Sequence, residues 1–289
     1  MLDKLHKPEF FEQPTNEPIA VAHRMNSQSA LDNARKTFER YNLPPYAEID
    51  VAHTRDGRLV VYHGSTNPWQ RYIKKRGPSI RKLAGKTFSE TRNFSIDGEP
   101  ISTLEDILNN NPDFRFFIHL KTNVAAKLLT DMLNNNERFR QQVNVGSFKR
   151  QHMQEFTQRM DERKETNTAI SFGDAAIESL LLVRENAKKT KTRKMANVAL
   201  RLVNADHFTA NEYWDRLSTN NWLAARYTTT NMLKVVREQL GVPVVTHFSL
   251  PSYVTRKGVD KKVNEGFDGI MGDNIELICA AIARKRNKS

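Results

Sequence analysis

Cysteine is almost absent from this 289-residue sequence, in which Cys279 is the only one. A single thiol excludes an internal disulfide and suits a reducing compartment. No apolar run approaches the ~18 residues that a membrane span needs, and residues 1–18 are polar, without the apolar core of a signal peptide. We therefore expect a cytoplasmic protein with no secretory signal and no transmembrane segment.

Acidic residues are the minority among the charged ones, because 33 Asp and Glu stand against 45 Lys and Arg, a formal net charge of +12. This excess attracts anions such as phosphate esters, nucleic acid or acidic lipid surfaces. The basic residues gather at 71–82, 188–194 and 284–289. Such runs are usually solvated loops or tails, but they leave contact with an anionic membrane surface or with nucleic acid open.

Short β-like runs alternate with helical patterns almost to the C-terminus, which is typical of βα units around a parallel sheet. With this length, we predict one α/β domain over 1–289, a (β/α)8 TIM barrel. Segment 64–100 is expected as a loop over the active-site end, and 284–289 as a basic tail. The ten strand candidates, two more than the barrel requires, are 18–24, 46–54, 58–63, 114–122, 143–148, 168–173, 197–208, 222–228, 242–248 and 267–274.

Helical spacing of apolar residues fills the intervals between these strands. One helix opens at Ser102 or Thr103, either of which can act as its N-cap, and another is closed by Gly241. The other predicted helices are 29–42, 125–135, a polar helix ending near 163, 175–189, one ending at 265, and 275–285.

Two of the predicted strands carry pairs of polar residues on one face. Glu48 and Asp50 are separated by one residue, so their carboxylates point the same way from a strand. His119 and Lys121 share a face of a later strand for the same reason. Because the βα loops of a barrel gather at the C-terminal ends of its strands, we expect these four side chains around one mouth.

Four more residues at or near strand ends are candidates for the same mouth: His23, Arg24, His63 and His247. Two imidazoles can serve as general base and general acid near neutral pH. An arginine can grip phosphate oxygens with its planar fork, and Lys121 can do so as a point charge. We interpret His152, which has no carboxylate nearby in the sequence, as a surface or loop residue.

Two carboxylates with an imidazole nearby suit a divalent cation. Oxygen ligands favour Mg²⁺ or Ca²⁺, and the imidazole of His119 also admits Mn²⁺ or Zn²⁺. Such a cation polarises a phosphoryl oxygen, so these groups together indicate metal-assisted cleavage of a phosphodiester. Structural interpretations stay open at this point: buried histidines bonded to the backbone, and a buried ion-pair cluster of the carboxylates with Arg24 and Lys121.

The order of short motifs carries a family resemblance. The sequence reads AHR, then EID with a TRDG turn, then VVYH, then PISTLEDIL, then a strand ending in HLK, and GFDGI near the C-terminus. This order resembles the glycerophosphodiester phosphodiesterase family, densely over 19–122 and thinly afterwards. The resemblance implies a (β/α)8 barrel and divalent-metal-dependent hydrolysis of glycerophosphodiesters to glycerol phosphate and an alcohol. It thus implies a phosphoric diester hydrolase of lipid metabolism.

The resemblance also implies a role for each candidate. His23 and His63 match the two catalytic histidines, Arg24 the phosphate-binding arginine, and Lys121 the lysine after the third metal ligand. Glu48 and Asp50 match metal ligands, and the third ligand, usually Glu in an E-x-K pair, is His119 here. Other departures are HRM for HRG, NSQS for a PENT-like box, Gly64 for the Asp of H-D, and Thr246-His247 for W-T.

Fragments YHG and LKT are also similar to the sphingomyelinase D/phospholipase D enzymes of spider venoms, which share the barrel but normally carry disulfides. Three hypotheses follow. The first is a metal-dependent hydrolase of a glycerophosphodiester, a related diester or a lysophospholipid. The second is a barrel without catalysis that binds an anionic polymer or membrane. The third is a sphingomyelinase D-like enzyme or a transferase that forms a cyclic or sugar phosphodiester.

Overall fold

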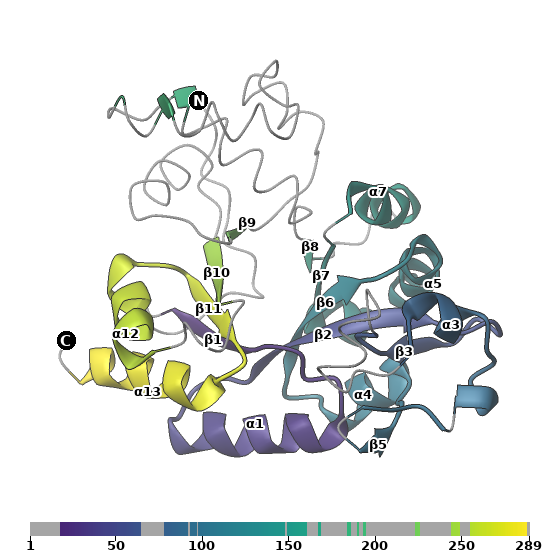
Figure 1. Ribbon diagram of the computed structural model, residues 1–289, viewed down its shortest axis with the longest axis horizontal. Helices are drawn as coiled ribbons and strands as arrows, with labels where there is room; N and C mark the ends of the chain where they lie inside the picture. Colours follow the sequence, from purple (N-terminus) through teal and green to yellow (C-terminus); the bar gives the residue numbers. More distant parts are fainter. Residues whose placement is uncertain are drawn as a thin grey trace. The chain divides into compact units, whose positions relative to one another are not determined.

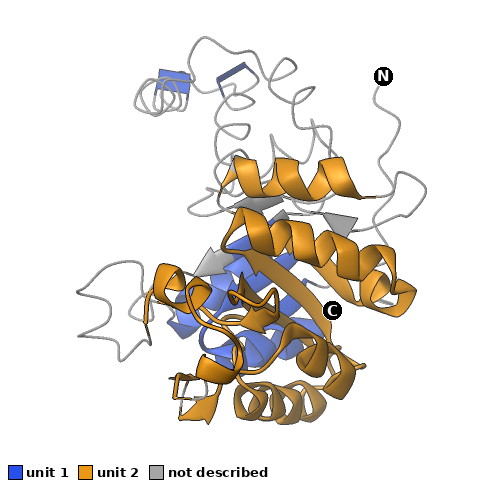
Figure 2. Ribbon diagram, turned by 90° about the vertical axis from the view of Figure 1, so that its right-hand side faces the viewer, with its two compact units in different colours: residues 1–20, 168–289 blue, residues 21–167 orange. Residues whose placement is uncertain are grey.

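The computed structural model describes two compact units, one of Val21–Asn167 and one that combines Met1–Ala20 with Thr168–Ser289 (Figure 2). Within them the described residues are 18–64, 78–91, 93–96, 98–147, 149–160, 167–168, 184–185, 190, 193–194, 223–225, 244–248 and 255–287.

The unit of Val21–Asn167 contains a parallel sheet in the order β7-β6-β2-β1 (Figure 1). Its strands are β1 (Ile19–Ala22), which begins in the other unit, β2 (Tyr46–His53), β6 (Arg115–Leu120) and β7 (Val143–Gly146). The helices of this unit that connect them or follow them are α1 (Gln28–Arg40), α4 (Leu104–Asn110), α5 (Asn123–Asn134), α6 (Glu137–Gln142) and α7 (Arg150–Arg159). Strand and helix alternate along this unit, as the sequence predicts.

Local sequence explains where these elements begin. Ser27 caps α1 by accepting a hydrogen bond from the backbone N–H of Ala30, and Thr103 caps α4 through the N–H of Asp106. Seven of the eight residues of β2 are buried, which is typical of a parallel strand covered on both faces. The sequence allows either Ser102 or Thr103 as the N-cap of α4, and in the structure the cap is Thr103.

A short antiparallel strand, β3 (Leu59–Val61), returns along β2. The turn between them places Gly57 at a φ of 76°, a conformation that glycine adopts without steric cost. The backbone N–H of Tyr62 then donates to the carbonyl of Asp50 at 2.7 Å. β3 is therefore outside the parallel series, which accounts for one of the surplus strand predictions.

The described part of the predicted loop, residues 78–100, has structure of its own. It contains α3 (Ile80–Ala84), a 3-10 helix (Ser89–Thr91) and a hairpin of β4 (Ser95–Ile96) with β5 (Glu99–Pro100). Ile80, Phe88, Phe94 and Ile96 pack against the buried cluster of Ala52, Val60, Tyr62, Leu83 and Ile101. The segment is thus anchored by apolar contacts, and its position over the active-site end stays a prediction.

In its described residues, the second unit contains the parallel strands β9 (Leu223–Ala225), β10 (Val244–Phe248) and β11 (Gly269–Gly272). The N–H of Ile19 bonds to the carbonyl of Asp268 at 2.8 Å. The helices α12 (Arg256–Glu265) and α13 (Ile275–Arg286) also belong to this unit, so α13 extends into the predicted basic tail. None of the described helices is long and apolar enough to cross a membrane.

Most of the segments that the sequence predicts as helix or strand, within the described residues, contain an element of that kind. Segment 222–228, left open between strand and helix, contains strand β9. Helix α6 was not predicted, because its sequence, ERFRQQ, is short and polar. The predicted strand 197–208, the helix 230–241 with Gly241, and nearly all of 168–173 and 175–189 lie outside the described residues.

Gly269 begins β11 at a position with no room for a side chain. A Cβ atom there would lie 2.8 Å from Ile19 Cγ1 and 2.9 Å from Val245 Cγ2. Gly269→Ala should therefore lower the free energy of unfolding by about 1–3 kcal/mol through overpacking, as measured by urea denaturation. Gly85→Ala is the control, since its Cβ would make only ordinary contacts of 3.6 Å or more. Equal effects of the two substitutions would contradict this explanation.

Candidate active site

Strand register brings the predicted site residues together. In the parallel pairing of β2 with β6, Asp50 is opposite His119 and Glu48 is opposite Phe117. Side chains opposite each other in a sheet project from the same face. Lys121 directly follows β6, and its backbone N–H donates to the carbonyl of Val51 at 3.0 Å. The two pairs that the sequence placed on separate strands thus form one group.

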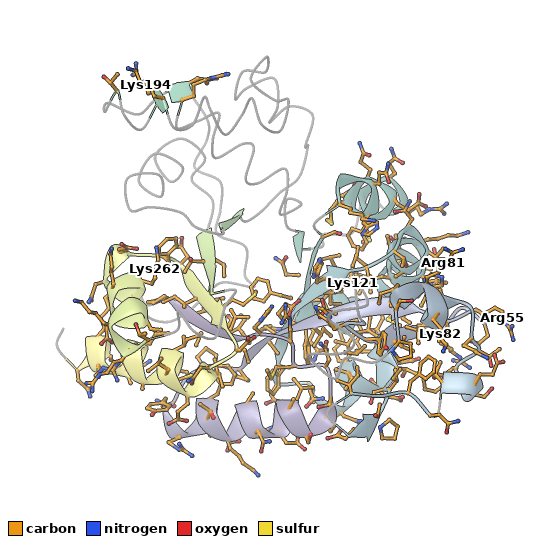
Figure 3. All side chains as sticks on the ribbon, in the orientation of Figure 1. Arg55, Arg81, Lys82, Lys121, Lys194 and Lys262 are labelled. Atoms are coloured by element: carbon orange, nitrogen blue, oxygen red, sulfur yellow. The ribbon has the colours of Figure 1, made fainter. Side chains whose placement is uncertain are left out.

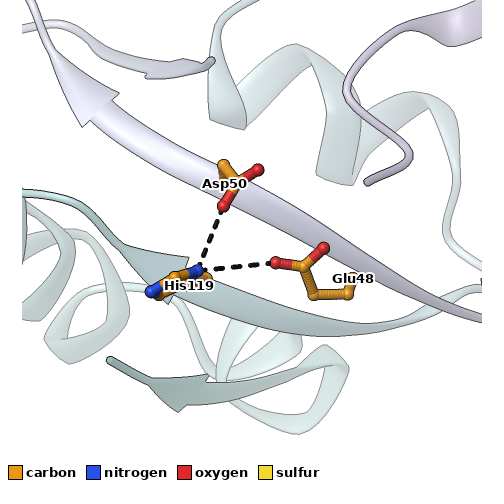
Figure 4. A group of neighbouring side chains, drawn as sticks. All are labelled: Glu48, Asp50 and His119. Carbon is orange, nitrogen blue, oxygen red and sulfur yellow. Dashed lines mark ion pairs between the residues drawn. The ribbon is translucent and has the colours of Figure 1, made fainter. Parts of the chain in front are cut away.

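The centre of this group consists of Glu48, Asp50 and His119, all buried (Figure 4). His119 Nδ1 lies 3.1 Å from Asp50 Oδ1 and 3.7 Å from Glu48 Oε1. One ligand atom from each residue lies within 4.8 Å of the others. Two carboxylate oxygens and an imidazole nitrogen at this spacing are a suitable donor set for a divalent cation.

Lys121 supplies positive charge to the same group. Its ammonium forms an ion pair with Asp50 Oδ1 and lies 2.9 Å from His119 Nδ1. The prediction of a buried ion-pair cluster is therefore correct for Lys121 and Asp50. It does not hold for Arg24, whose guanidinium has no ion pair among the described residues, although its backbone N–H donates to Glu48 Oε2 at 2.9 Å.

The two predicted catalytic histidines each lie beside one carboxylate of the group. His23 Nε2 is 3.8 Å from Glu48 Oε2, and His63 Nε2 is 3.9 Å from Asp50 Oδ2. His63 follows the antiparallel strand β3, so the reversal of the chain after Gly57 is what returns it to Asp50. Both imidazoles thus reach the carboxylate pair through Nε2.

A hydrogen bond to the backbone defines the tautomer of His63. Its Nδ1 lies 2.7 Å from the carbonyl oxygen of Gly64, and because a carbonyl only accepts, Nδ1 carries the proton. In the neutral ring, Nε2 then has a lone pair directed toward the site. Burial lowers the pKa of His63 to about 4, against the opposite effect of Asp50, so the ring is neutral at pH 7.

Burial and charge separate the pKa values of the other central groups. Burial, and then the neighbouring Asp50, raise the pKa of Glu48 to about 7. Burial alone would also raise the pKa of Asp50, but Lys121 and His119 lower it well below its usual range. Burial and Lys121 lower the pKa of His119 to about 4. At neutral pH, Asp50 is therefore ionised, His119 is neutral, and Glu48 exchanges a proton readily.

The turn after β1 presents Arg24 in an unusual backbone conformation. Its φ is 61°, in the left-handed region that costs a non-glycine residue about 1–3 kcal/mol. The backbone N–H of Arg24 donates to Glu48 Oε2, and that of Met25 donates to the backbone carbonyl of Glu48, at 2.9 Å each. These bonds compensate for the strain and tie the turn to both the side chain and the backbone of Glu48.

Asn26 is a site residue that the sequence reasoning missed. It is 4% exposed, its Oδ1 accepts from the backbone N–H of Asp50 at 2.9 Å, and its Nδ2 donates to Asp50 Oδ2 at 3.3 Å. Its position three residues after His23 was the available signal. In the sequence, the surrounding NSQS stands out only as a departure from a family motif.

His247 is the one predicted site residue outside the unit of Val21–Asn167. It lies in β10, opposite Met271 of β11, and its side chain is outside the described part of the structure. Its role in binding substrate stays a prediction.

Comparison with known proteins identifies the family of this chain. The model of the glycerophosphoryl diester phosphodiesterase family matches residues 23–277. The chain belongs to this family. The match includes all the predicted site residues, and the prediction of a phosphoric diester hydrolase is confirmed. No curated protein sequence matches the chain significantly.

Solved structures confirm the fold. A glycerophosphodiester phosphodiesterase from Agrobacterium tumefaciens is similar with a TM-score of 0.62 at 15% identity, covering 91% of this chain and 99% of that one. A putative one from Silicibacter pomeroyi gives 0.64 at 12% identity, with 96% of each chain covered. A phosphodiesterase from Oleispira antarctica, in complex with sn-glycerol-3-phosphate, gives 0.55 at 15% identity, covering 92% and 97%. The (β/α)8 barrel prediction is thereby confirmed.

Asn26→Leu tests the support of Asp50. The change keeps the branched shape of the side chain but leaves the Asp50 N–H and Oδ2 without these partners, so the free energy of unfolding should fall by about 1–3 kcal/mol. Urea denaturation measures the change. Asn33→Leu, at an exposed position of α1, is the matched control and should change it by less than about 0.5 kcal/mol. If Asn33→Leu lowered the free energy of unfolding as much as Asn26→Leu, the proposed stabilisation through the bonds from Asn26 to Asp50 would be contradicted.

Proposed function

We propose that this protein is a metal-dependent glycerophosphodiester phosphodiesterase that uses His23 and His63 for acid and base catalysis. The observation that carries the proposal is the pairing of each histidine with one carboxylate of the buried Glu48, Asp50 and His119 group. Membership of the family supports the same reaction class.

In this proposal, His63 is the general base. Its neutral ring has a lone pair on Nε2, because Nδ1 donates to the Gly64 carbonyl, and that lone pair can accept a proton from the attacking water. A new P–O bond forms as the proton moves to Nε2. The nearby Asp50 then stabilises the imidazolium that results.

His23 is the general acid on the opposite side of the reaction. The bond between phosphorus and the leaving alcohol oxygen breaks, and His23 protonates that oxygen. Glu48 lies beside this ring, with Oε2 at 3.8 Å from His23 Nε2. The products are glycerol phosphate and a free alcohol. His63 then loses its proton to solvent and His23 takes one up before the next cycle.

Glu48, Asp50 and His119 are the residues that would hold a divalent cation. When bound, it supplies Lewis-acid stabilisation of the negative charge on a phosphoryl oxygen. Arg24 is available for a second phosphate oxygen, since its guanidinium pairs with no described residue, and Lys121 adds a point charge from the other side. We retain His247 as a further contact to substrate.

The imidazole of His119 affects which metal the site would bind. Compared with a glutamate, a neutral imidazole removes one negative charge from the ligand set, so we propose weaker binding of Mg²⁺ or Ca²⁺ and better tolerance of Mn²⁺ or Zn²⁺. The Oleispira enzyme was solved with sn-glycerol-3-phosphate as its product. We propose the same glycerol phosphate product here when the substrate is a glycerophosphodiester in the cytoplasm. A lysophospholipid would instead give an acylated glycerol phosphate, because its acyl ester is not cleaved.

The basic surface supports a second role, contact with an anionic lipid surface. Arg81 and Lys82 of α3 are exposed, as is Arg55 in the turn before β3 (Figure 3). These side chains lie at the outer part of the unit, away from Lys121 in the site. Binding to anionic vesicles that falls steeply with salt would support this role.

Removal of either catalytic histidine should abolish most of the activity. We expect His23→Ala and His63→Ala each to lower kcat by about 10²–10⁴-fold, the usual contribution of general acid–base catalysis. Phosphorus NMR on glycerophosphodiesters, lysophospholipids and sugar phosphodiesters, with and without a chelator, identifies the products. His53→Ala is the control, since that imidazole bonds to Thr122 outside the carboxylate group. Undiminished activity in both site variants would disprove the assigned roles, and a cyclic phosphate product would replace hydrolysis with cyclisation.

Cation binding should weaken as the pH falls below 7. With a pKa of about 7 in the protein without a cation, Glu48 is increasingly protonated below that pH and must lose its proton to bind. The affinity should therefore fall by up to about tenfold per pH unit below 7 and level off above it. Calorimetric titration with Mn²⁺ at pH 6, 7 and 8 measures this. Glu48→Gln should bind more weakly and lose the pH dependence, whereas a flat wild-type profile would contradict a titrating Glu48.

A further inference from the structure

The peptide group between Leu120 and Lys121 is held from both sides of β6. On one side, the N–H of Lys121 donates to the carbonyl of Val51 in β2 at 3.0 Å. On the other, the carbonyl of Leu120 accepts from the Ser147 hydroxyl at 3.0 Å and faces His152 Nδ1 at 3.1 Å. This peptide directly precedes the Cα atom of Lys121 and comes one residue after His119.

The contacts of Ser147 and His152 define their hydrogen-bond roles. The Ser147 hydroxyl donates to Leu120, so its oxygen accepts, both from the N–H of Lys149 at 3.1 Å and from His152 Nδ1 at 2.8 Å. His152 therefore carries a proton on Nδ1. The Ser147 hydroxyl, His152 Nδ1 and the Leu120 carbonyl thus all have partners, as buried polar groups require.

The side chains of Ser147 and His152 supply the hydrogen bonds to Leu120 that strand β7 does not provide. The last paired residues of β6 and β7 are His119 and Gly146, so Leu120 lies beyond the ladder. Without the side chains of Ser147 and His152, its buried carbonyl would lose both of these hydrogen-bond partners. Ser147 is 1% exposed and His152 is 5% exposed, which corrects the interpretation of His152 as a surface or loop residue. It lies on the buried side of α7 with Met153 and Phe156.

We propose that Ser147 and His152 are positioning residues of the active site, acting through the Leu120–Lys121 peptide. By fixing this peptide, they direct the Lys121 ammonium toward Asp50 and hold His119 opposite it. The expected effect on catalysis rests on the proposed function. The expected effect on the position of Lys121 and His119 rests on the backbone contacts alone. Neither residue contacts the carboxylates in the described structure.

The test compares two replacements of His152. Asparagine places an amide N–H close to the position of Nδ1 and should preserve the bond to Leu120, whereas leucine fills the space without a donor. We expect His152→Leu to lower kcat/KM for a glycerophosphodiester by about 10- to 100-fold, the cost of a misplaced site group, and to weaken Mn²⁺ binding in calorimetry. His152→Asn should stay within about threefold of the wild type in both measurements.

Phe156→Leu is the matched control, because it removes volume from the same buried side of α7 without touching the Leu120 carbonyl. It should lower the melting temperature while leaving kcat/KM and Mn²⁺ affinity within about threefold. Ser147→Ala and Ser147→Thr provide an independent pair if His152→Leu does not fold, with loss expected for alanine and retention for threonine.

Hydrogen exchange at the Lys121 amide separates this inference from the proposed function. Faster exchange in His152→Leu and Ser147→Ala, with wild-type exchange in His152→Asn and Phe156→Leu, supports the positioning role even if no diester is hydrolysed. Equal behaviour of His152→Leu and His152→Asn, or a loss of activity and Mn²⁺ affinity in Phe156→Leu as large as in His152→Leu, would overturn it. Unchanged Lys121 exchange in all the variants would also overturn it.

Discussion

The burial of two carboxylates on one strand is the constraint on which this site depends. Glu48 and Asp50 are both almost inaccessible to solvent, and a buried anion is costly unless it is paired or protonated. The protein meets this cost differently at the two positions. Asp50 is paired with Lys121 and keeps its charge, whereas Glu48 holds a proton up to about pH 7. A divalent cation would let both carboxylates ionise, which is a physical reason for such a cation to bind here.

The backbone around the carboxylates is shaped to support them. The strained turn at Arg24 provides two N–H groups to Glu48, and the reversal into β3 returns His63 to Asp50. Asn26 bonds to both the backbone and the side chain of Asp50. These contacts hold the two carboxylates in place before any substrate arrives, which is the arrangement that electrostatic catalysis favours.

His119 distinguishes this chain from the usual pattern of its family. A glutamate at that position would add a third negative charge to a group already difficult to bury. The imidazole instead lies within reach of both carboxylates and of Lys121, and its low pKa keeps it neutral and available as a ligand. The imidazole thus lowers the negative charge of this group compared with a glutamate at the same position.

The sequence alone determined the alternation of strands and helices, the barrel and the shared face of Glu48 with Asp50. These follow from local periodicity and from motif order, both of which are properties of neighbouring residues. Tertiary structure decided what depends on distant partners. The antiparallel direction of β3, the bonds of Asn26 to Asp50, and the contact of His152 with Leu120 join residues 24 to 32 positions apart or depend on strand pairing. No local pattern distinguishes such a buried Asn or His from a surface one, because the partner that satisfies it is brought near only by folding.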